Sequence, residues 1–240
     1  MLDAAHFLMS PQTVHQFAEK VALISDAGSP VGRAAAIQLA LQGSYVIGLF
    51  PGEGGSLSEL VELGTLAHAF NADPSTAAGA AAAADEVERL FGRLDLLVNC
   101  LKFKPESAFN DLTEPGFTDT VRINLGSVHF LTNAVLRLMN GRPKPKIVNI
   151  AWSDREGGDA LFAASQAGIV SLTGSMAREL PPKFRTNCVE VPLEPPAAEN
   201  EGGLLLRSPS AVAPDDVART ILFLLSSESI GMNGQVIRLG

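Results

Sequence analysis

The sequence lacks the features that would place it in a membrane, outside the cell or on a nucleic acid. Its 240 residues contain no apolar run of about 18 residues, the length that a membrane-crossing helix needs. The first residues have neither the basic start nor the apolar core of a signal peptide. The net charge is −8 and Lys and Arg form no basic stripe. We therefore expect no membrane and no nucleic acid among the partners.

Cysteine and histidine are scarce. Cys100 and Cys188 each fall inside an apolar, strand-like run, which favours buried free thiols and a reducing cytoplasm. The four histidines are scattered, with no carboxylate–histidine–nucleophile pattern and no metal-ligand spacing. We expect no metal site and a cytoplasmic location.

Strand-like and helix-like segments alternate from about residue 20 to residue 240. Apolar runs rich in branched residues predict buried parallel strands at 21–25, 45–50, 65–70, 94–99, 146–151, 186–191 and 235–239. Helical patterns lie at 31–42, 56–63, 75–91, 115–139, 159–179 and 214–226. This alternation predicts an α/β protein: one Rossmann-like, doubly wound domain over 20–240 with a seven-stranded parallel sheet flanked by helices.

Two segments stand outside the alternation. Residues 1–19 precede the first strand and are interpreted as a flexible N-terminal arm or a short helix. Residues 192–214 carry five prolines around Gly202-Gly203. In a fold of this type that segment lies over the ligand crevice, so a lid and a mobile surface loop are both open interpretations.

Five local strings occur in the order in which one known family carries them. They lie at 20–25, 94–99, 121–125, 146–150 and 234–239. Over roughly residues 18–240 the chain resembles the short-chain dehydrogenase/reductase family, especially the 3-oxoacyl-carrier-protein reductase type. The resemblance implies a doubly wound fold, an NAD(P) cofactor and a catalytic set of Asn, Ser, Tyr and Lys. It also implies that Asn124 is the family's catalytic Asn.

The catalytic residues of that family are replaced. Its Tyr-x-x-x-Lys sequence puts both side chains on one helix face, where the ammonium lowers the pKa of the phenol. Here the matching positions are Phe162 and Gln166, and the family's Ser falls on Trp152. Ser153 is one step further along the strand and so points to the opposite face. Asn124 is all that remains of the catalytic set, and its side chain can instead stabilise a distortion in a helix.

The loop that would bind the cofactor also differs from the family's sequence. The family's Thr-Gly-x-x-x-Gly-x-Gly loop lets backbone N–H groups reach the dinucleotide pyrophosphate. Here Asp26 and Pro30 replace two glycines, Gly32 survives and Gly28 offers a rearranged turn. A carboxylate would face the pyrophosphate, and proline has no N–H. If any cofactor binds, the resemblance implies that the cofactor-binding residues are Ser25, Gly28, Gly32, Asp73 and Asn99.

Asp73 can alternatively be the N-cap of a helix that starts at Pro74. Residues 48–52, after the second strand, contain neither the Asp nor the Arg that would select NAD or NADP.

Three functions are consistent with these residues. The first is a non-catalytic binding or oligomer-partner subunit that has lost hydride transfer. The second is an NAD(P)-dependent oxidoreductase with an atypical active site, and the third is a ligand-sensing regulator. In the family, two long helices pair across a dimer axis. We expect helices 115–139 and 159–179 to form a homo-oligomer, or a hetero-oligomer with an active relative.

Overall fold

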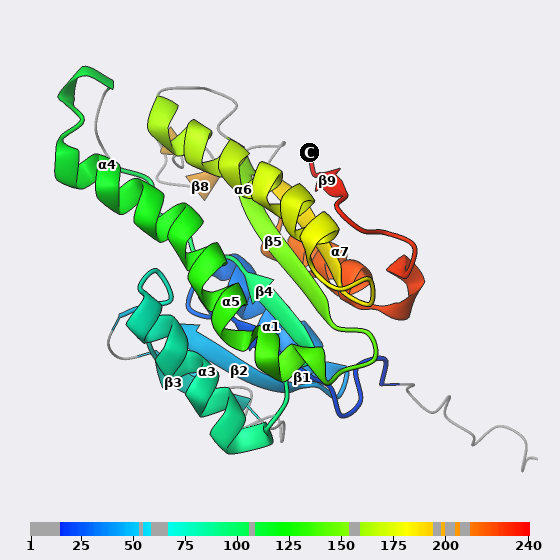
Figure 1. Cartoon of the computed structure of the whole chain (residues 1–240). Coiled ribbons are helices and arrows are strands. Elements are labelled where there is room, and N and C mark those ends of the chain that lie inside the picture. Colours follow the sequence, from blue (N-terminus) through cyan, green and yellow to red (C-terminus); the bar gives the residue numbers. More distant parts are fainter. Residues whose placement is uncertain are drawn as a thin grey trace, which may run out of the picture.

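Seven parallel strands form a sheet at the centre of the chain in the computed structural model (Figure 1). The structure describes residues 15–52, 55–58, 67–105, 109–153, 159–193, 198–199, 205–206 and 212–240. The strands are β1 (Val21–Ile24), β2 (Tyr45–Phe50), β3 (Ala67–Asn71), β4 (Leu96–Asn99), β5 (Lys146–Ser153), β6 (Arg185–Pro192) and β9 (Val236–Arg238). Their order in space is β3-β2-β1-β4-β5-β6-β9. This confirms the predicted doubly wound sheet and places its switch point between β1 and β4, where a crevice opens at the carboxyl ends of the strands.

Helices cover both faces of the sheet (Figure 1). One layer consists of α1 (Pro30–Leu41) and α7 (Pro214–Leu225). The other consists of α3 (Ala77–Phe91), α4 (Glu114–Val121), η3 (Arg122–Gly126), α5 (Ser127–Asn140) and α6 (Ala160–Glu179). Three clusters of buried apolar side chains hold the layers together, two of them large, and the smaller third one joins α5 and α6 to β5 and β6. The central strands are continuous apolar runs because they are buried on both faces.

Most predicted elements form within two residues of their expected ends. Helix 115–139 is interrupted, because α4 runs into the π-helical turn η3 before α5 begins. Helix 75–91 begins at Ala77 and ends before Gly92, whose φ of 63° suits the left-handed residue that stops a helix. Of helix 56–63 the structure describes only residues 56–58, and Ser58 is the helical residue among these three.

The segments outside the repeating pattern are only partly described. Residues 15–19 form a turn rather than a free arm or a helix, because Phe17 is 2% exposed and its N–H donates to the carbonyl oxygen of Gln42 (3.1 Å). Residues 1–14 lie outside the described residues. Within the predicted lid, β7 (Ala198–Glu199) and β8 (Leu205–Leu206) pair antiparallel, and the rest of 194–211 lies outside the described residues.

Helix α6 is unusually apolar. Among the described residues it is the one helix whose length and composition would suffice to cross a membrane, and 28% of its apolar window is buried. The helix packs on β5 and β6 beside η3. We therefore interpret it as a layer helix of the domain with an apolar outer face.

Candidate functional site

The first βα turn, where a dinucleotide pyrophosphate would bind, is closed by the chain's own groups. Ser29 is the N-cap of α1: its Oγ accepts from the Gly32 N–H (3.2 Å) and donates to the carbonyl oxygen of Asp26 (2.9 Å). The Asp26 carboxylate accepts from the Ser29 N–H (3.2 Å). Pro30, the first helical residue, has no N–H to offer.

The same closed helix start recurs at α3, in the third βα unit. There Thr76 Oγ1 accepts from the Gly79 N–H (3.0 Å) and donates to the carbonyl oxygen of Asp73 (3.1 Å). A Cβ built on either Gly32 or Gly79 would overlap the backbone carbonyl of the preceding Asp. The survival of Gly32 is therefore explained by helix geometry and needs no cofactor.

Asp26 makes the crevice unsuited to a pyrophosphate. Burial raises the pKa of this carboxyl, while hydrogen bonds from the Ser29 and Gly28 backbones and the nearby charge of Lys102 act in the opposite direction. A dinucleotide would bring further negative charge beside this carboxylate, and the helix N–H of Gly32 is already engaged. The residues at this turn, as they are arranged here, do not fit the pyrophosphate of NAD(P).

The other expected cofactor residues are engaged inside the fold. Ser25 Oγ accepts from the N–H groups of Cys100 and Leu101 (2.9 and 3.2 Å) and so fixes the turn after β4. Asn99 is buried and its amide donates to Asn149 Oδ1 (2.9 Å).

Gly28 is exposed, and a Cβ there would meet the Phe50 ring (3.4 Å) and Asp26 Oδ1 (3.6 Å) at ordinary contact distances. This glycine is therefore not required by close packing, unlike Gly32.

Asp73 is not the N-cap of α3, and its side chain is held by Ser75 and Arg122. The N-cap is Thr76, so the N-cap prediction was wrong in its residue. Asp73 Oδ1 accepts from the Ser75 N–H (2.9 Å), and Oδ2 pairs with Arg122 (3.3 Å). Burial acts to raise the pKa of Asp73, but the Ser75 hydrogen bonds and the Arg122 charge outweigh it, and the net pKa is lowered.

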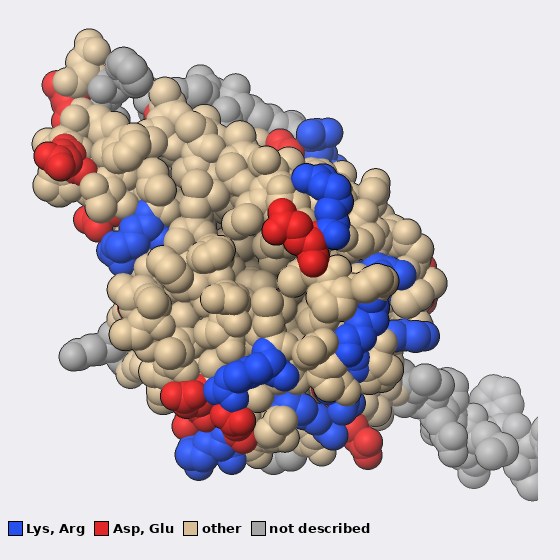
Figure 2. Space-filling view, in the orientation of Figure 1, with Lys and Arg blue, Asp and Glu red and all other residues tan. Residues whose placement is uncertain are grey.

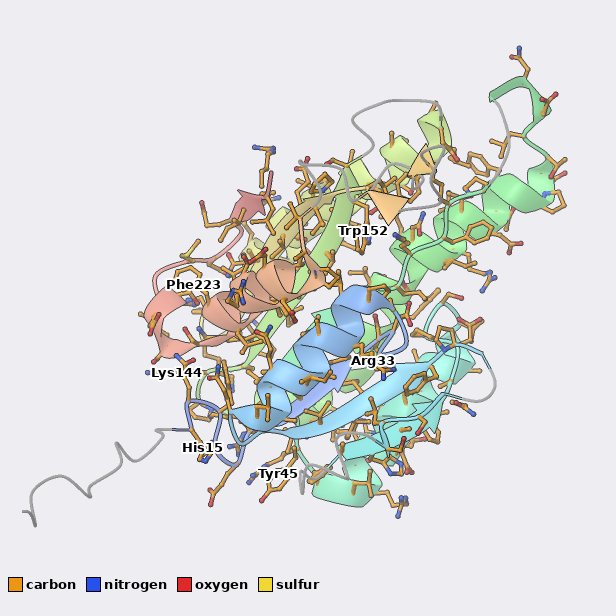
Figure 3. The ribbon with its side chains drawn as sticks, turned by 180° about the vertical axis from the view of Figure 1, so that it is seen from behind. His15, Arg33, Tyr45, Lys144, Trp152 and Phe223 are labelled. Atoms are coloured by element: carbon orange, nitrogen blue, oxygen red, sulfur yellow. The ribbon has the colours of Figure 1, made fainter. Side chains whose placement is uncertain are left out.

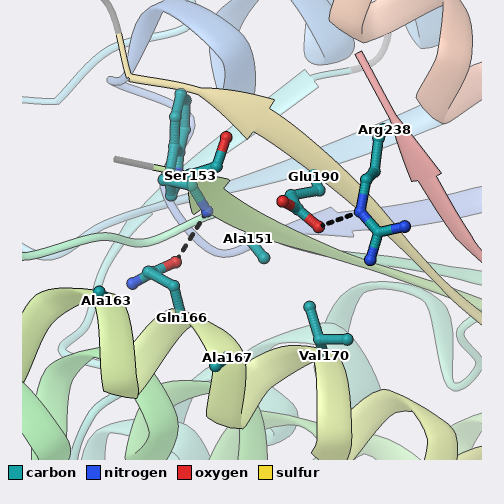
Figure 4. Close-up of a pocket in the computed structure, with 9 residues that line it drawn as sticks. Ala151, Ser153, Ala163, Gln166, Ala167, Val170, Glu190 and Arg238 are labelled. Atoms are coloured by element: carbon teal, nitrogen blue, oxygen red, sulfur yellow. Dashed lines mark hydrogen bonds and ion pairs between the residues drawn. The ribbon is translucent and has the colours of Figure 1, made fainter. Parts of the chain in front are cut away.

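At the catalytic positions, Phe162 and Gln166 serve the packing of α6. Phe162 is fully buried. Gln166 Oε1 accepts from the backbone N–H of Trp152 (2.9 Å), so this side chain turns to β5 and braces the strand (Figure 4). No ionisable side chain stands at any of the three positions, which rules out the family's usual proton relay through them.

Asn124 lies in the π-helical turn η3 and joins that turn to the segment after β4. Its Oδ1 accepts from the Phe103 N–H (2.7 Å), and its Nδ2 donates to the Phe103 carbonyl oxygen (2.9 Å) and to Ser165 Oγ (2.8 Å). Its side-chain contacts thus hold a loop and a helix together.

Two lysines from the segment after β4 lie over the replaced catalytic positions. Lys102 Nζ is 3.9 Å from the centroid of the Trp152 ring, and Lys104 Nζ is 5.7 Å from the centroid of the Phe162 ring. Both distances are within the range of cation–π attraction. The contacts hold this segment across the position where substrate and cofactor would meet.

Trp152 lines two cavities in the crevice. A cavity of about 430 Å³ lies on the side of α1 and the end of β6, and one of about 320 Å³ lies between α6 and β5, β6 and β9. The smaller contains Ser153, Gln166 and the Glu190–Arg238 ion pair (3.0 Å, Figure 4).

No other phenol can replace the missing one. Tyr45 is the only tyrosine in the chain. It begins β2, stacks on Phe91 (ring centroids 5.4 Å apart) and lies at the opposite end of the sheet from Trp152 (Figure 3). Among the described residues no group of three His, Cys, Asp or Glu side chains could hold a metal ion.

Sequence reasoning missed the two lysines and the repeated helix start. The repeated helix start could have been found in the sequence, since an Asp, a Ser or Thr and a Gly recur at the same spacing in 26–32 and 73–79. The lysine contacts had none, because Lys102 and Trp152 are fifty residues apart and meet only through the pairing of β4 with β5.

Comparison with known proteins agrees with this architecture. A sequence model of the family described as enoyl-(acyl carrier protein) reductase matches residues 27–239. The 3-oxoacyl-(acyl-carrier-protein) reductase FabG of Escherichia coli (strain K12) is 26% identical over 93% of this chain and 96% of its own length. A hydroxy(phenyl)methyl succinyl-CoA dehydrogenase subunit, BbsD of Thauera aromatica, is 31% identical over 91% of this chain and 94% of its own.

Solved structures give the same result. The crystal structure of a short chain dehydrogenase from Mycobacterium smegmatis superposes with a TM-score of 0.82 at 28% identity, covering 94% of this chain and 93% of the other.

Proposed function

The chain belongs to the short-chain dehydrogenase/reductase family, and from this premise we propose that it is a member without hydride transfer that acts as a non-catalytic binding or oligomer-partner subunit. The observation that carries the proposal is the fate of the three catalytic positions. Trp152 lines the crevice with an indole, Phe162 packs in the core and the Gln166 side chain accepts a hydrogen bond from the β5 backbone. None of these side chains transfers a proton at neutral pH.

The size of the rate contribution that acid/base groups normally make supports loss of activity. One acid/base group typically contributes about 10²–10⁴-fold to the rate. The effects of residues that act as a unit are not additive, but here no member of the Ser, Tyr and Lys set remains. The sole tyrosine, Tyr45, is at the other end of the sheet and cannot substitute.

The outer face of α4 to α6 supports a partner role. Phe117 is 51% exposed on α4, and Ala164 is exposed on α6. Charged side chains on this side of the molecule lie mostly toward its margins, apart from a group of both signs over the later part of α6, and they leave the surface over the middle of α5 and the start of α6 largely uncharged (Figure 2). Small residues allow helices to approach closely, so this face suits a second copy or an active relative.

Binding of the cofactor is the first test. Calorimetry with NADPH and NADH should detect no binding up to about millimolar concentration, which corresponds to less than about 4 kcal/mol of binding free energy. A short-chain reductase with an intact glycine loop serves as the positive control. Micromolar binding would contradict the proposal, because it would require the Asp26 turn to accommodate a pyrophosphate.

Restoring the catalytic residues is the second test. Two variants are assayed for NADPH oxidation with a 3-oxoacyl substrate. The first is the triple variant Trp152→Ser/Phe162→Tyr/Gln166→Lys, and the second also carries Asp26→Gly/Pro30→Gly. Activity in the second variant alone would show that the turn at Asp26 prevents activity even when the catalytic residues are restored. Circular dichroism checks that each variant folds.

An NAD(P)-dependent oxidoreductase with an atypical active site is the second candidate. The observation in its favour is that Lys102 and Lys104 hold ammonium groups over the rings of Trp152 and Phe162, where a proton donor would be useful. NADPH consumption by the parent protein that is lost in Lys104→Met would establish it. A cytoplasmic location stays a prediction.

A further inference from the structure

The larger cavity in the crevice is a pocket of ligand size with mostly apolar walls. Its volume of about 430 Å³ falls within the range of small-molecule sites. The apolar wall is formed by residues of α1, β6, the segment before α7 and β5, namely Pro30, Val31, Trp152, Val191, Pro192, Leu193, Val212 and Pro214. Such walls favour an apolar ligand body.

The charged groups of this cavity balance each other. Asp26 and Lys102 both line it, and the Lys102 charge attracts the Asp26 carboxylate. The Ser29 hydroxyl and the Cys100 thiol are engaged with the Asp26 carbonyl oxygen (2.9 and 3.5 Å). A ligand with a net charge would add an unbalanced charge in an apolar pocket, which is costly. A neutral ligand avoids that cost.

One buried donor beside the cavity lacks a partner. Trp152 is 8% exposed, and its Nε1 is itself buried with no hydrogen-bond acceptor among the described residues, so a ligand meets this N–H when the indole ring turns towards the cavity. Leaving a buried N–H unpaired is unfavourable, and this is the kind of group that a ligand can satisfy.

We propose that the crevice binds a small, neutral, apolar molecule carrying one hydrogen-bond-accepting oxygen, with its apolar body among the valines and prolines and its oxygen against the Trp152 indole. The inference rests on the proposed function, because a dinucleotide would compete for the same space. The ligand carries no phosphate, since the Asp26 turn has closed the phosphate position.

The protein carries its own reporter for this site, because Trp152 is its only tryptophan. Three compounds of similar shape are titrated: 1-indanone, which is neutral with an accepting oxygen, indane, which lacks the oxygen, and indane-1-carboxylate, which is charged. Tryptophan fluorescence gives one readout and calorimetry the other. We expect 1-indanone to bind about fivefold more tightly than indane, the factor that a typical net hydrogen bond supplies, and the carboxylate to bind more weakly than both.

Matched variants locate the ligand. Val212→Phe fills the larger cavity and should abolish binding, whereas Val170→Phe, in the wall of the smaller cavity, should leave it unchanged. In Trp152→Phe, followed by calorimetry, the preference for 1-indanone over indane should disappear. Thermal unfolding of each variant confirms that it is folded.

Four results would overturn the inference: no saturable binding of 1-indanone to the parent, equal binding of all three compounds, tighter binding of the carboxylate, or loss of binding in Val170→Phe with binding kept in Val212→Phe. The same titration with NADPH separates this inference from the proposed function. If neither NADPH nor 1-indanone binds, only the inference fails. If NADPH binds at micromolar concentration, the proposed function fails whatever 1-indanone does.

Discussion

Among single residues, Asp26 links the stability of the first βα turn to pH. Burial raises the pKa of its carboxyl above the ordinary value of 3.8. Between 3.8 and the raised value the folded state holds the proton more tightly than the unfolded state, so the contribution of this group to the unfolding free energy falls as pH rises. Above that window the ionised carboxylate is a constant penalty.

The variant Asp26→Asn tests this linkage. Asparagine retains an oxygen that can accept from the Ser29 N–H but carries no charge. We expect the difference in unfolding free energy, variant minus parent, to rise from pH 3.8 through the window and to be zero or positive at pH 7. Urea unfolding at several pH values measures it. A variant clearly less stable than the parent at pH 7 would contradict the assignment of burial as the main cause.

The two thiols should be inert in the native protein. Burial raises the pKa of Cys100 and of Cys188 to about 12. At pH 8 the reactive thiolate is then only about one part in 10⁴. A colorimetric thiol reagent should label neither cysteine in native protein and both in denaturant. Rapid labelling of the native protein would show that one of them is accessible.

At the scale of elements, three helices begin with the same arrangement of a capping hydroxyl and a glycine three residues later. Gly32, Gly79 and Gly116 are these glycines in α1, α3 and α4. A Cβ at Gly32 or Gly79 would overlap a backbone carbonyl oxygen, whereas at Gly116 it would lie 3.4 Å from a leucine methyl, an ordinary contact.

Alanine at each position distinguishes packing from helix propensity. Gly32→Ala and Gly79→Ala should each destabilise by about 1–3 kcal/mol, because backbone has to move. Gly116→Ala is the matched control and should be neutral or stabilising by up to about 1 kcal/mol, because alanine favours helix more than glycine. Chemical denaturation provides the values. Equal effects at all three sites would refute the steric explanation of Gly32 and reopen a cofactor role for it.

At the scale of the whole molecule, the largely uncharged surface over the middle of α5 and the start of α6 predicts self-association or association with a relative. Ala164 is exposed near the start of α6. An arginine there would place a charge in a close helix contact. We expect Ala164→Arg to shift the protein to a smaller species in analytical ultracentrifugation.

Ala82→Arg is the control, because Ala82 is equally an exposed helical alanine but lies on α3. If the parent protein is already monomeric, the homo-oligomer proposal is wrong. Co-purification with an active reductase then tests the hetero-oligomer proposal. If both variants dissociate the oligomer equally, α6 is not the interface.

The fold follows from signals that lie within short stretches of the sequence. Apolar strand runs, helix starts and glycine stops are local signals, and five strings in family order fixed the strand sequence. The same local patterns located the replaced catalytic residues at Trp152, Phe162 and Gln166, because a catalytic helix is recognised from residues four apart.

Only the tertiary structure decided what the replacements do. Gln166 meets the backbone of Trp152 because α6 packs on β5, and Lys102 meets the indole because β4 and β5 are neighbours. The larger cavity beside Trp152 likewise depends on walls from the turn after β1, from β5 and β6 and from the start of α7, which are far apart in sequence. Such contacts are set by how the elements pack, and hydrophobic periodicity determines which face of an element is buried without specifying which side chains meet there.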